Sequence, residues 1–196
     1  MSTAPSKKQI THDRIVETAA RAIRRAGFGG VGVADIMNEA GLTHGGFYAH
    51  FASRDALLCE AIERAGKDSA ARIAKSSSIR QAQGASAFRA FVENYLSDRH
   101  LASLESGCPV AALASEMPRQ ARMVGEAAAQ RVRGLIAAVQ SALPSAASRG
   151  TATAIASQLV GALQLARALG DNAEGKVVLA ATRRTLLERY DATDPR

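Results

Sequence analysis

Residues 41–51 read GLTHGGFYAHF, and this stretch decides the fold. Its aromatic residues have helical spacing, yet Gly45 and Gly46 lie in its middle, where a glycine costs an exposed helix about 1 kcal/mol relative to alanine. A short helix is predicted just before it, over residues 33–40, and Thr43 is a suitable N-cap for the next one. Two short helices joined by a three-residue turn form a helix-turn-helix, whose second helix enters the major groove of DNA.

A helical wheel divides this stretch into a core side and a bare side. At about 100° per residue, Phe47 and Phe51 fall together and are expected to point inward, each contributing about 1.5–3 kcal/mol through burial. Small residues occupy the opposite side, which permits a close approach to base edges. We expect main-chain approach at the two glycines, a base contact from the first turn and phosphate contacts from the flanks, which gives the DNA-binding set Thr43, His44, Gly45, Gly46, Tyr48, His50 and Arg54. For Tyr48 and His50 the alternative is a partly buried packing role.

The rest of the chain favours helices. Alanine is abundant, tryptophan is absent and no alternating strand pattern occurs, so we predict an all-α fold of about nine helices. Residues 1–10 are polar and are expected to be loose, and the serine-rich residues 76–84 are expected to form a loop. The longer helices are predicted at about 12–26, 53–75, 119–143, 148–169 and 173–190.

Composition limits the class of protein. The net charge is +7 with a pI of about 10.0, which permits a polyanionic partner, but the excess is spread along the chain and does not locate it. Only Cys59 and Cys108 are present, so a disulfide framework is excluded. The N-terminus lacks an apolar signal region and the most apolar stretch, residues 151–169, is interrupted by polar residues. We therefore expect a cytoplasmic protein without a membrane span.

Several further segments complete a recognisable pattern. They are Gly27-Phe28, VADI at 33–36, EAGLT at 39–43, the aromatic run at 47–51, SRD at 53–55 with Leu57, and GCPVAAL at 107–113. With these residues the sequence resembles the TetR family of bacterial repressors, over about the first quarter to third of the chain. The LTHGGFYAHF and GCPVAAL segments are similar to one large subgroup of that family.

The resemblance implies two domains. Residues 8–70 would form a three-helix DNA-binding domain with its helix-turn-helix motif at about 32–51, and residues 71–196 would bind a small effector. The homodimer would form through the helices at about 148–169 and 173–190. Two copies would then read a near-palindromic operator in double-stranded DNA. The resemblance implies a bacterial repressor that is associated with the nucleoid when bound and is released by its effector.

The effector pocket is less well specified by the sequence. Aromatic residues and methionines fit a small apolar or electrophilic effector, and they fit an ordinary core equally well. The candidates for the lining are Phe88, Phe91, Tyr95, Leu113, Met117 and Met123. Cys108 precedes Pro109 at a predicted helix start, where the helix dipole would lower the pKa of its thiol. It is therefore a possible redox or electrophile sensor, the alternative being a small buried residue.

Other classes have less support. A Cys108–His100 pair lacks an evident third orienting group, so we do not expect an enzyme. Neither H-x-x-x-H nor C-x-x-C occurs, so neither a metal nor a cofactor is expected. A DNA-binding architectural protein without an effector is the remaining alternative.

Overall fold

The computed structural model describes residues 5–144 and 147–191. Within these ranges the chain forms nine α-helices and two short 3-10 helices and has no strand, which confirms the all-α prediction. No helix in this part of the chain combines the length and apolar character that a bilayer crossing requires. The elements are α1 (Lys7–Ala26), α2 (Val33–Glu39), η1 (His44–Ala49), α3 (Arg54–Ala82), α4 (Ala87–Tyr95), α5 (Asp98–Ala102), α6 (Pro109–Leu113), η2 (Met117–Arg119), α7 (Arg122–Ala142), α8 (Arg149–Leu169) and α9 (Ala173–Tyr190).

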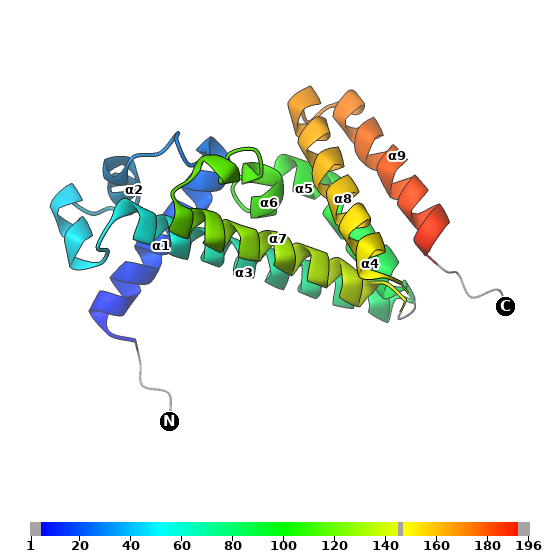
Figure 1. Ribbon diagram of the computed structural model, residues 1–196, viewed down its shortest axis with the longest axis horizontal. Coiled ribbons are helices and arrows are strands. Elements are labelled where there is room, and N and C mark those ends of the chain that lie inside the picture. The colour runs from blue at the N-terminus through cyan, green and yellow to red at the C-terminus, as the bar shows by residue number, and fades with distance from the viewer. Residues whose placement is uncertain (1–4, 145–146, 192–196) are drawn as a thin grey trace.

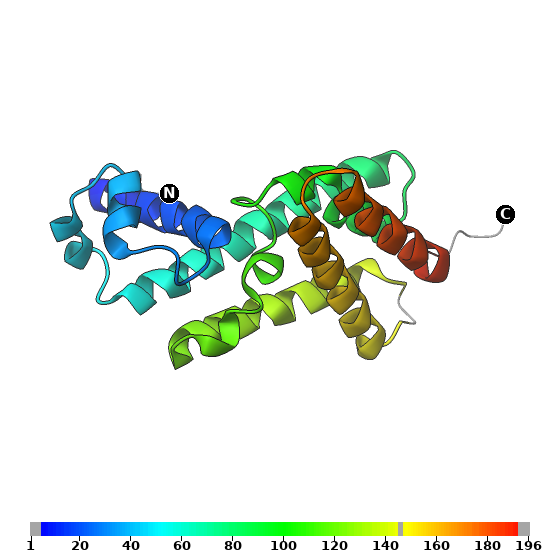
Figure 2. The same cartoon turned by 90° about the horizontal axis from the view of Figure 1, so that it is seen from above.

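Two long helices organise the molecule. Figure 1 shows α3 and α7 running side by side along the longest axis, with α1, α2 and η1 gathered at one end. The helices α8 and α9 form an antiparallel pair at the other end, and the view from above in Figure 2 shows the same separation. The helix-turn-helix thus lies at one extremity of an elongated chain.

A first apolar core surrounds the start of α3. Its members come from α1, α2, η1 and the first half of α3, and include Ile15, Ile23, Phe28, Ile36, Phe47, Phe51, Leu57, Leu58 and Ile62. Four residues from much later in the chain complete it, namely Leu113, Met117, Val124 and Ala128. The second half of the sequence therefore helps to fix the N-terminal helices.

A second apolar core lies between α4, α7, α8 and α9. It includes Phe88, Phe91, Val92, Tyr95, Leu96, Val139, Ile155, Leu159, Leu163, Leu179 and Leu186. The helix α3 runs past residue 70 without a break, so it belongs to both halves of the molecule. The expected division at residues 70 and 71 stays a prediction.

The predicted loop over residues 76–84 is wrong for its first seven residues, because α3 continues to Ala82. Serine is a poor helix former mainly because its hydroxyl competes for backbone groups. Here tertiary packing outweighs that preference: Ser77 is buried, and Arg80 forms an ion pair with Glu93 of α4 at 2.5 Å. Packing of α4 on α3 thus sets the length of the helix.

Two other boundaries differ from the prediction. The N-terminal residues from Lys7 onward are helical rather than loose, because the Ser6 hydroxyl accepts the N–H of Gln9 at 3.2 Å and caps α1. Residues 1–4, which belong to the same expectation, lie outside the described residues. The helix expected from residue 119 begins at Arg122, since Met117–Arg119 forms η2.

Candidate nucleic-acid interface

The turn between α2 and η1 depends on Gly41. Its φ of 69° lies in the left-handed region, which favours glycine. The Gly41 N–H donates to Asn38 O at 2.9 Å, and the Leu42 N–H donates to Met37 O at 2.9 Å. These bonds close the end of α2 and set the direction in which the chain enters η1.

The segment His44–Ala49 is a 3-10 helix, whereas an α-helix was predicted over residues 43–51. The Gly46 N–H donates to Thr43 O at 3.1 Å and the His50 N–H donates to Phe47 O at 2.9 Å, both with the three-residue spacing of that geometry. Thr43 occupies the N-cap position, but its side chain makes no capping hydrogen bond there. The two adjacent glycines and the missing capping hydrogen bond of Thr43 both disfavour an α-helix here, so the segment forms the tighter 3-10 helix.

Phe47 and Phe51 anchor this segment, as predicted. They are 2% and 3% exposed, and their rings stack with centroids 5.5 Å apart. The ring of His12 in α1 stacks on Phe51 at 4.5 Å, and its Nε2 lies 2.7 Å from Glu60 Oε2 of α3. The segment is therefore held by α1 and α3 together.

The outward side of η1 is bare at one position and aromatic at the next turn. Because a 3-10 helix has about three residues per turn, Gly45 and Tyr48 share one side. Tyr48 is 73% exposed, and a Cβ placed on Gly45 would meet nothing within 4 Å. His44 and Ala49 are also exposed. The side of Gly45 and Tyr48 therefore offers a phenol beside a position without a side chain.

Gly46 and His50 lie differently from the expectation. A Cβ on Gly46 would lie 3.7 Å from Met37 Cε, so this position faces α2 rather than the outside. The Nδ1 atom of His50 is buried without a hydrogen-bond partner in the described part of the chain, and burial lowers the pKa of its imidazole, as do the neighbouring His12 and Lys8. These observations favour the packing alternative for His50.

Arg54 is turned toward the protein. Its Nη2 donates to Phe28 O and, at 3.3 Å, to Val31 O, so the guanidinium holds the loop between α1 and α2. Its phosphate contact, like the contacts of Thr43, stays a prediction. The structure gives Arg54 a supporting role that the sequence pattern did not reveal.

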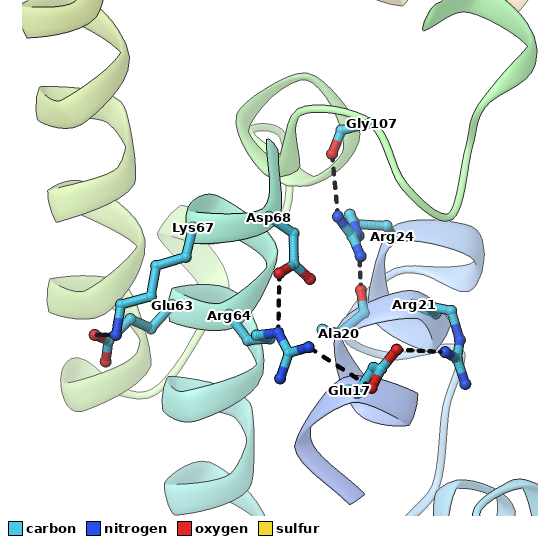
Figure 3. A network of polar contacts seen from close by, with 9 residues as sticks. All are labelled: Glu17, Ala20, Arg21, Arg24, Glu63, Arg64, Lys67, Asp68 and Gly107. Carbon is cyan, nitrogen blue, oxygen red and sulfur yellow. Dashed lines mark hydrogen bonds and ion pairs between the residues drawn. The ribbon is translucent and has the colours of Figure 1, made fainter. Parts of the chain in front are cut away.

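Ion pairs fasten α1 to α3. Figure 3 shows Arg64 between Glu17 of α1 and Asp68 of its own helix, at 3.6 Å and 2.9 Å respectively. Arg24 is 6% exposed and reaches away from this pair, with Nε donating to Ala20 O at 2.8 Å and Nη1 donating to Gly107 O at 3.3 Å. These contacts fix α1, which packs beside the helix-turn-helix, to α3 and to the loop before α6.

Comparison with known proteins agrees with this geometry. Residues 15–61 match the family model described as bacterial regulatory proteins, tetR family. A protein of Mycobacterium tuberculosis (strain H37Rv), named as an uncharacterized HTH-type transcriptional regulator, is 29% identical over 174 residues, covering 83% of this chain and 87% of that protein.

Solved structures share the fold over nearly the whole chain. A TetR-family regulator from Agrobacterium tumefaciens has a TM-score of 0.76 at 23% identity, covering 94% of this chain and 99% of that one. A TetR regulator from Chloroflexus aurantiacus has a TM-score of 0.73 at 22% identity, covering 94% and 97%. These matches show that the chain shares the fold of TetR-family regulators. The relatives with similar sequences are named as HTH-type transcriptional regulators.

Away from η1, the structure contains a cavity of about 510 Å³. We call it the apolar cavity. It lies between α3 and α7, with Phe91 of α4 and the start of α6 completing its wall. Small side chains dominate the lining, and its volume is within the usual range of about 300–1,000 Å³ for small-molecule sites.

Of the six residues predicted to line a pocket, Phe91 alone borders this cavity. Phe88 packs edge-on against Tyr190, and Tyr95 is fully buried in the second core. Leu113 and Met117 belong to the first core, and Met123 is 52% exposed. The aromatic and methionine residues are therefore core residues in most cases, which was the alternative reading.

The sequence does contain a pattern that indicates the lining of the apolar cavity. On α3 the lining residues are Gly66, Ser69, Ala70, Ile73, Ala74, Ser77 and Gln81, and on α7 they are Arg131, Gly134, Leu135, Ala138, Ser141 and Ala142. Both sets recur every three or four residues, so each forms one helical face of mainly small side chains. Facing stripes of this kind leave space between two helices.

Cys108 borders the apolar cavity at the N-cap of α6 and is 4% exposed. Its N–H donates to His100 Nε2 at 2.9 Å, while His100 Nδ1 lies 2.7 Å from Tyr95 O. His100 is thus neutral with its proton on Nδ1, and burial lowers the pKa of the imidazole to about 4. The five-residue α6 is short, so the dipole expected to activate the thiol is weak. Within the described ranges no three His, Cys, Asp or Glu side chains gather as a metal site would require.

The outer face of α8 and α9 is apolar. Leu165 is 62% exposed, Val177 is 65% exposed, and a shallow groove between the helices is lined by Gly161, Ala162 and Val178 among others. This is the face that the family resemblance assigns to dimer formation.

Proposed function

We propose that this chain is a homodimeric transcriptional repressor of a bacterial cytoplasm, which binds a near-palindromic operator and leaves it when a small apolar effector enters the apolar cavity. The observation that carries the DNA-binding part is the outward side of η1. Gly45 is open and Tyr48 is 73% exposed on a segment that two buried phenylalanines fix from behind. A rigid segment with a bare strip suits close approach to base edges.

A substitution at the bare strip tests the DNA-binding role. Gly45→Val places a branched side chain where the open space admits it, so the fold tolerates the change while the groove does not. We expect at least a tenfold loss of affinity for a specific operator duplex, measured by fluorescence anisotropy at fixed salt. Gly125→Val is the matched control, because the nearest atom to a Cβ there is Met117 O at 4.0 Å and the residue lies on α7 outside the lining of the apolar cavity.

The outcome separates the alternatives. Equal affinity of the native protein for the operator and for random duplexes would favour the architectural alternative. Unchanged operator affinity in a folded Gly45→Val dimer would contradict the assignment of η1 to the groove. Tyr48→Phe removes one hydroxyl and is expected to weaken operator and random DNA similarly, since a phosphate contact carries no sequence information.

The dimer is supported by the exposed apolar residues on α8 and α9. A face with Leu165 and Val177 largely exposed favours burial against a second copy. In a two-fold dimer, the two η1 segments must meet successive major grooves about 34–36 Å apart. Leu165→Glu is expected to yield monomers in sedimentation velocity runs and to abolish operator binding, whereas Met123→Glu, an exposed apolar residue on α7, should do neither.

An electrophile sensor is the second candidate, and the position of Cys108 favours it. The thiol borders the apolar cavity, so an electrophilic compound inside it would lie next to a nucleophile. Cys108→Ser should then abolish operator release by electrophiles while release by non-reactive apolar compounds persists. If both classes of compound still released the serine variant from the operator, the electrophile sensor would be contradicted and the simple effector mechanism would be the remaining explanation.

A further inference from the structure

A second hollow lies on a different side of α3. It has a volume of about 330 Å³ and is bordered by α3, by the segment from Asn94 to His100 and by the loop before α6. We call it the basic cleft. Its lining differs from that of the apolar cavity, because three cationic side chains and several hydroxyls face it, including Arg72, Lys75, Ser76, Arg99, Ser103 and Ser106.

The three cations have no carboxylate partner. Among the described residues, the charged side chains of Arg72, Lys75 and Arg99 make no ion pair and no hydrogen bond. Burial lowers the pKa of Arg72, the negative charge of Asp68 raises it, and the positive charge of Arg99 lowers it. The charges of Arg72 and Arg99 therefore act on each other, and neither forms an ion pair with a carboxylate among the described residues.

The nearby carboxylates are already committed to other cations. Figure 3 shows one of them, Asp68, directed at Arg64, and its negative charge also raises the pKa of Arg72. The four pairs are Asp68–Arg64 at 2.9 Å, Glu93–Arg80 at 2.5 Å, Asp98–Lys176 at 3.6 Å and Glu105–Arg25 at 2.7 Å. Within the described residues the cleft cations are therefore free of direct ion pairs and can pair with an anion from outside the chain.

The inner wall adds further positive charge. Arg24 donates to Gly107 O, and Arg167 donates to Ser103 O and His100 O, so one buried and one half-buried guanidinium group contact the cleft loop. Burial, followed by repulsion from Arg72, lowers the pKa of Arg24 to about 10, so the group stays charged at neutral pH. Neutral His100 contributes no compensating charge.

DNA is not the source of the missing charge. Arg72 follows Arg54 by 18 residues on the same helix, which places it about 27 Å farther from η1. The cleft volume lies at the lower end of the range for small-molecule sites, about 300–1,000 Å³. Both its place and its size suit a metabolite.

We propose that the basic cleft is a second ligand site, separate from the apolar cavity, that binds a small molecule bearing a carboxylate or phosphate group. Arg72 and Arg99 bind the anionic group, with Lys75 adding a third cation. The hydroxyls of Ser76, Ser103 and Ser106 donate hydrogen bonds to its oxygens or to the polar remainder of the ligand. Binding does not require DNA, so the site stands or fails independently of the repressor mechanism.

Isothermal titration calorimetry of the full chain at low ionic strength tests this site with three probes. Inorganic phosphate and citrate represent the two anion classes, and glycerol is the neutral control. We expect saturable binding of at least one anion and none of glycerol. The double variant Arg72→Gln/Arg99→Gln should weaken that binding at least tenfold, whereas Arg122→Gln, whose side chain is 92% exposed on α7, should leave it within twofold.

A second variant works in the opposite direction. Ser76→Glu places a carboxylate beside the unpaired cations, so it should abolish anion binding and raise the melting temperature. Binding of phosphate alone or of citrate alone identifies the anion class. Absence of binding by both anions, equal loss in Arg122→Gln, or full binding by either cleft variant would overturn the proposal.

Discussion

The two ends of α3 differ in how they are packed. Near its start, Leu57, Leu58 and Ile62 are at most 1% exposed and meet side chains from α1, α2 and η1. Beyond Gly66 the same helix borders the apolar cavity, and from Ser69 onward it also borders the basic cleft. One end is a dense core and the other is flanked by two hollows.

This difference in packing gives the two ends of α3 different properties: one end holds a surface segment in place, and the other leaves space for a ligand. A close-packed core holds a surface segment in one position, because its side chains have no alternative arrangement of similar energy. A helix lined with small and polar residues gives up packing energy but leaves space for ligands. The dense end therefore suits presentation of η1, and the hollow end suits ligand binding.

The largest expected effect comes from truncation at the dense end. Phe47→Ala removes a ring that is 2% exposed and should lower the free energy of unfolding by about 3–5 kcal/mol. Urea denaturation followed by circular dichroism measures it. Ile79→Ala, which removes a side chain 54% exposed beside the basic cleft, should cost less than about 1 kcal/mol. Equal losses would remove the distinction between the two ends.

A pH dependence from His100 comes next. Its pKa is about 4 in the folded state, below the ordinary value of 6.5, so the unfolded chain binds the proton first as the pH falls. The stability from this group is complete above pH 6.5 and is lost as the pH approaches 4, about 3 kcal/mol in all. Chemical denaturation at pH 7 and pH 4 should show that excess loss in the native protein relative to His100→Gln, which keeps a donor and an acceptor. Parallel losses would contradict it.

Gly107→Ala probes the wall of the basic cleft. A Cβ there would lie 2.6 Å from Arg167 Nη2, 2.8 Å from Ser103 O and 2.9 Å from His100 Nε2. The resulting displacement should cost about 1–3 kcal/mol in thermal or urea unfolding. Gly134→Ala has open space and should instead stabilise α7 by up to about 1 kcal/mol. An unchanged free energy of unfolding in Gly107→Ala would show that the residues around Gly107 can move aside at little cost.

The smallest effect is expected from filling the apolar cavity. Ala138→Leu extends a side chain into space that α7 already borders, so the free energy of unfolding should change by less than about 1 kcal/mol. The same variant should bind apolar compounds more weakly in a thermal-shift screen. A destabilisation as large as that of Phe47→Ala would show that the hollow end is packed as tightly as the dense one.

The helix-turn-helix could be predicted in detail because its constraints are local. Gly41 follows the end of α2, and Phe47 and Phe51 are buried, as the sequence indicated. The helix type could not be predicted in the same way. An α-helical wheel put Gly46 on the bare side, whereas the 3-10 geometry turns it toward Met37. Three residues per turn instead of 3.6 changes which side chains share a side.

The hollows could not be predicted from residue type alone. Aromatic residues and methionines fill space, so most of those proposed for the pocket lie in cores instead. The actual lining depends on which stripes of α3 and α7 face each other, and α3 was expected to end before Ser77. The role of Arg54 was also hidden, because its acceptors are main-chain oxygens of Phe28 and Val31.

Arg25 lies at a junction whose consequence extends beyond stability. Its guanidinium joins Glu39, the last residue of α2, at 2.8 Å and Glu105, in the loop that borders the basic cleft, at 2.7 Å. A single side chain therefore connects α2 of the helix-turn-helix to the loop that borders the basic cleft. A shift of that loop would change the ion pair of Arg25 with Glu105 and, through it, the contact with α2.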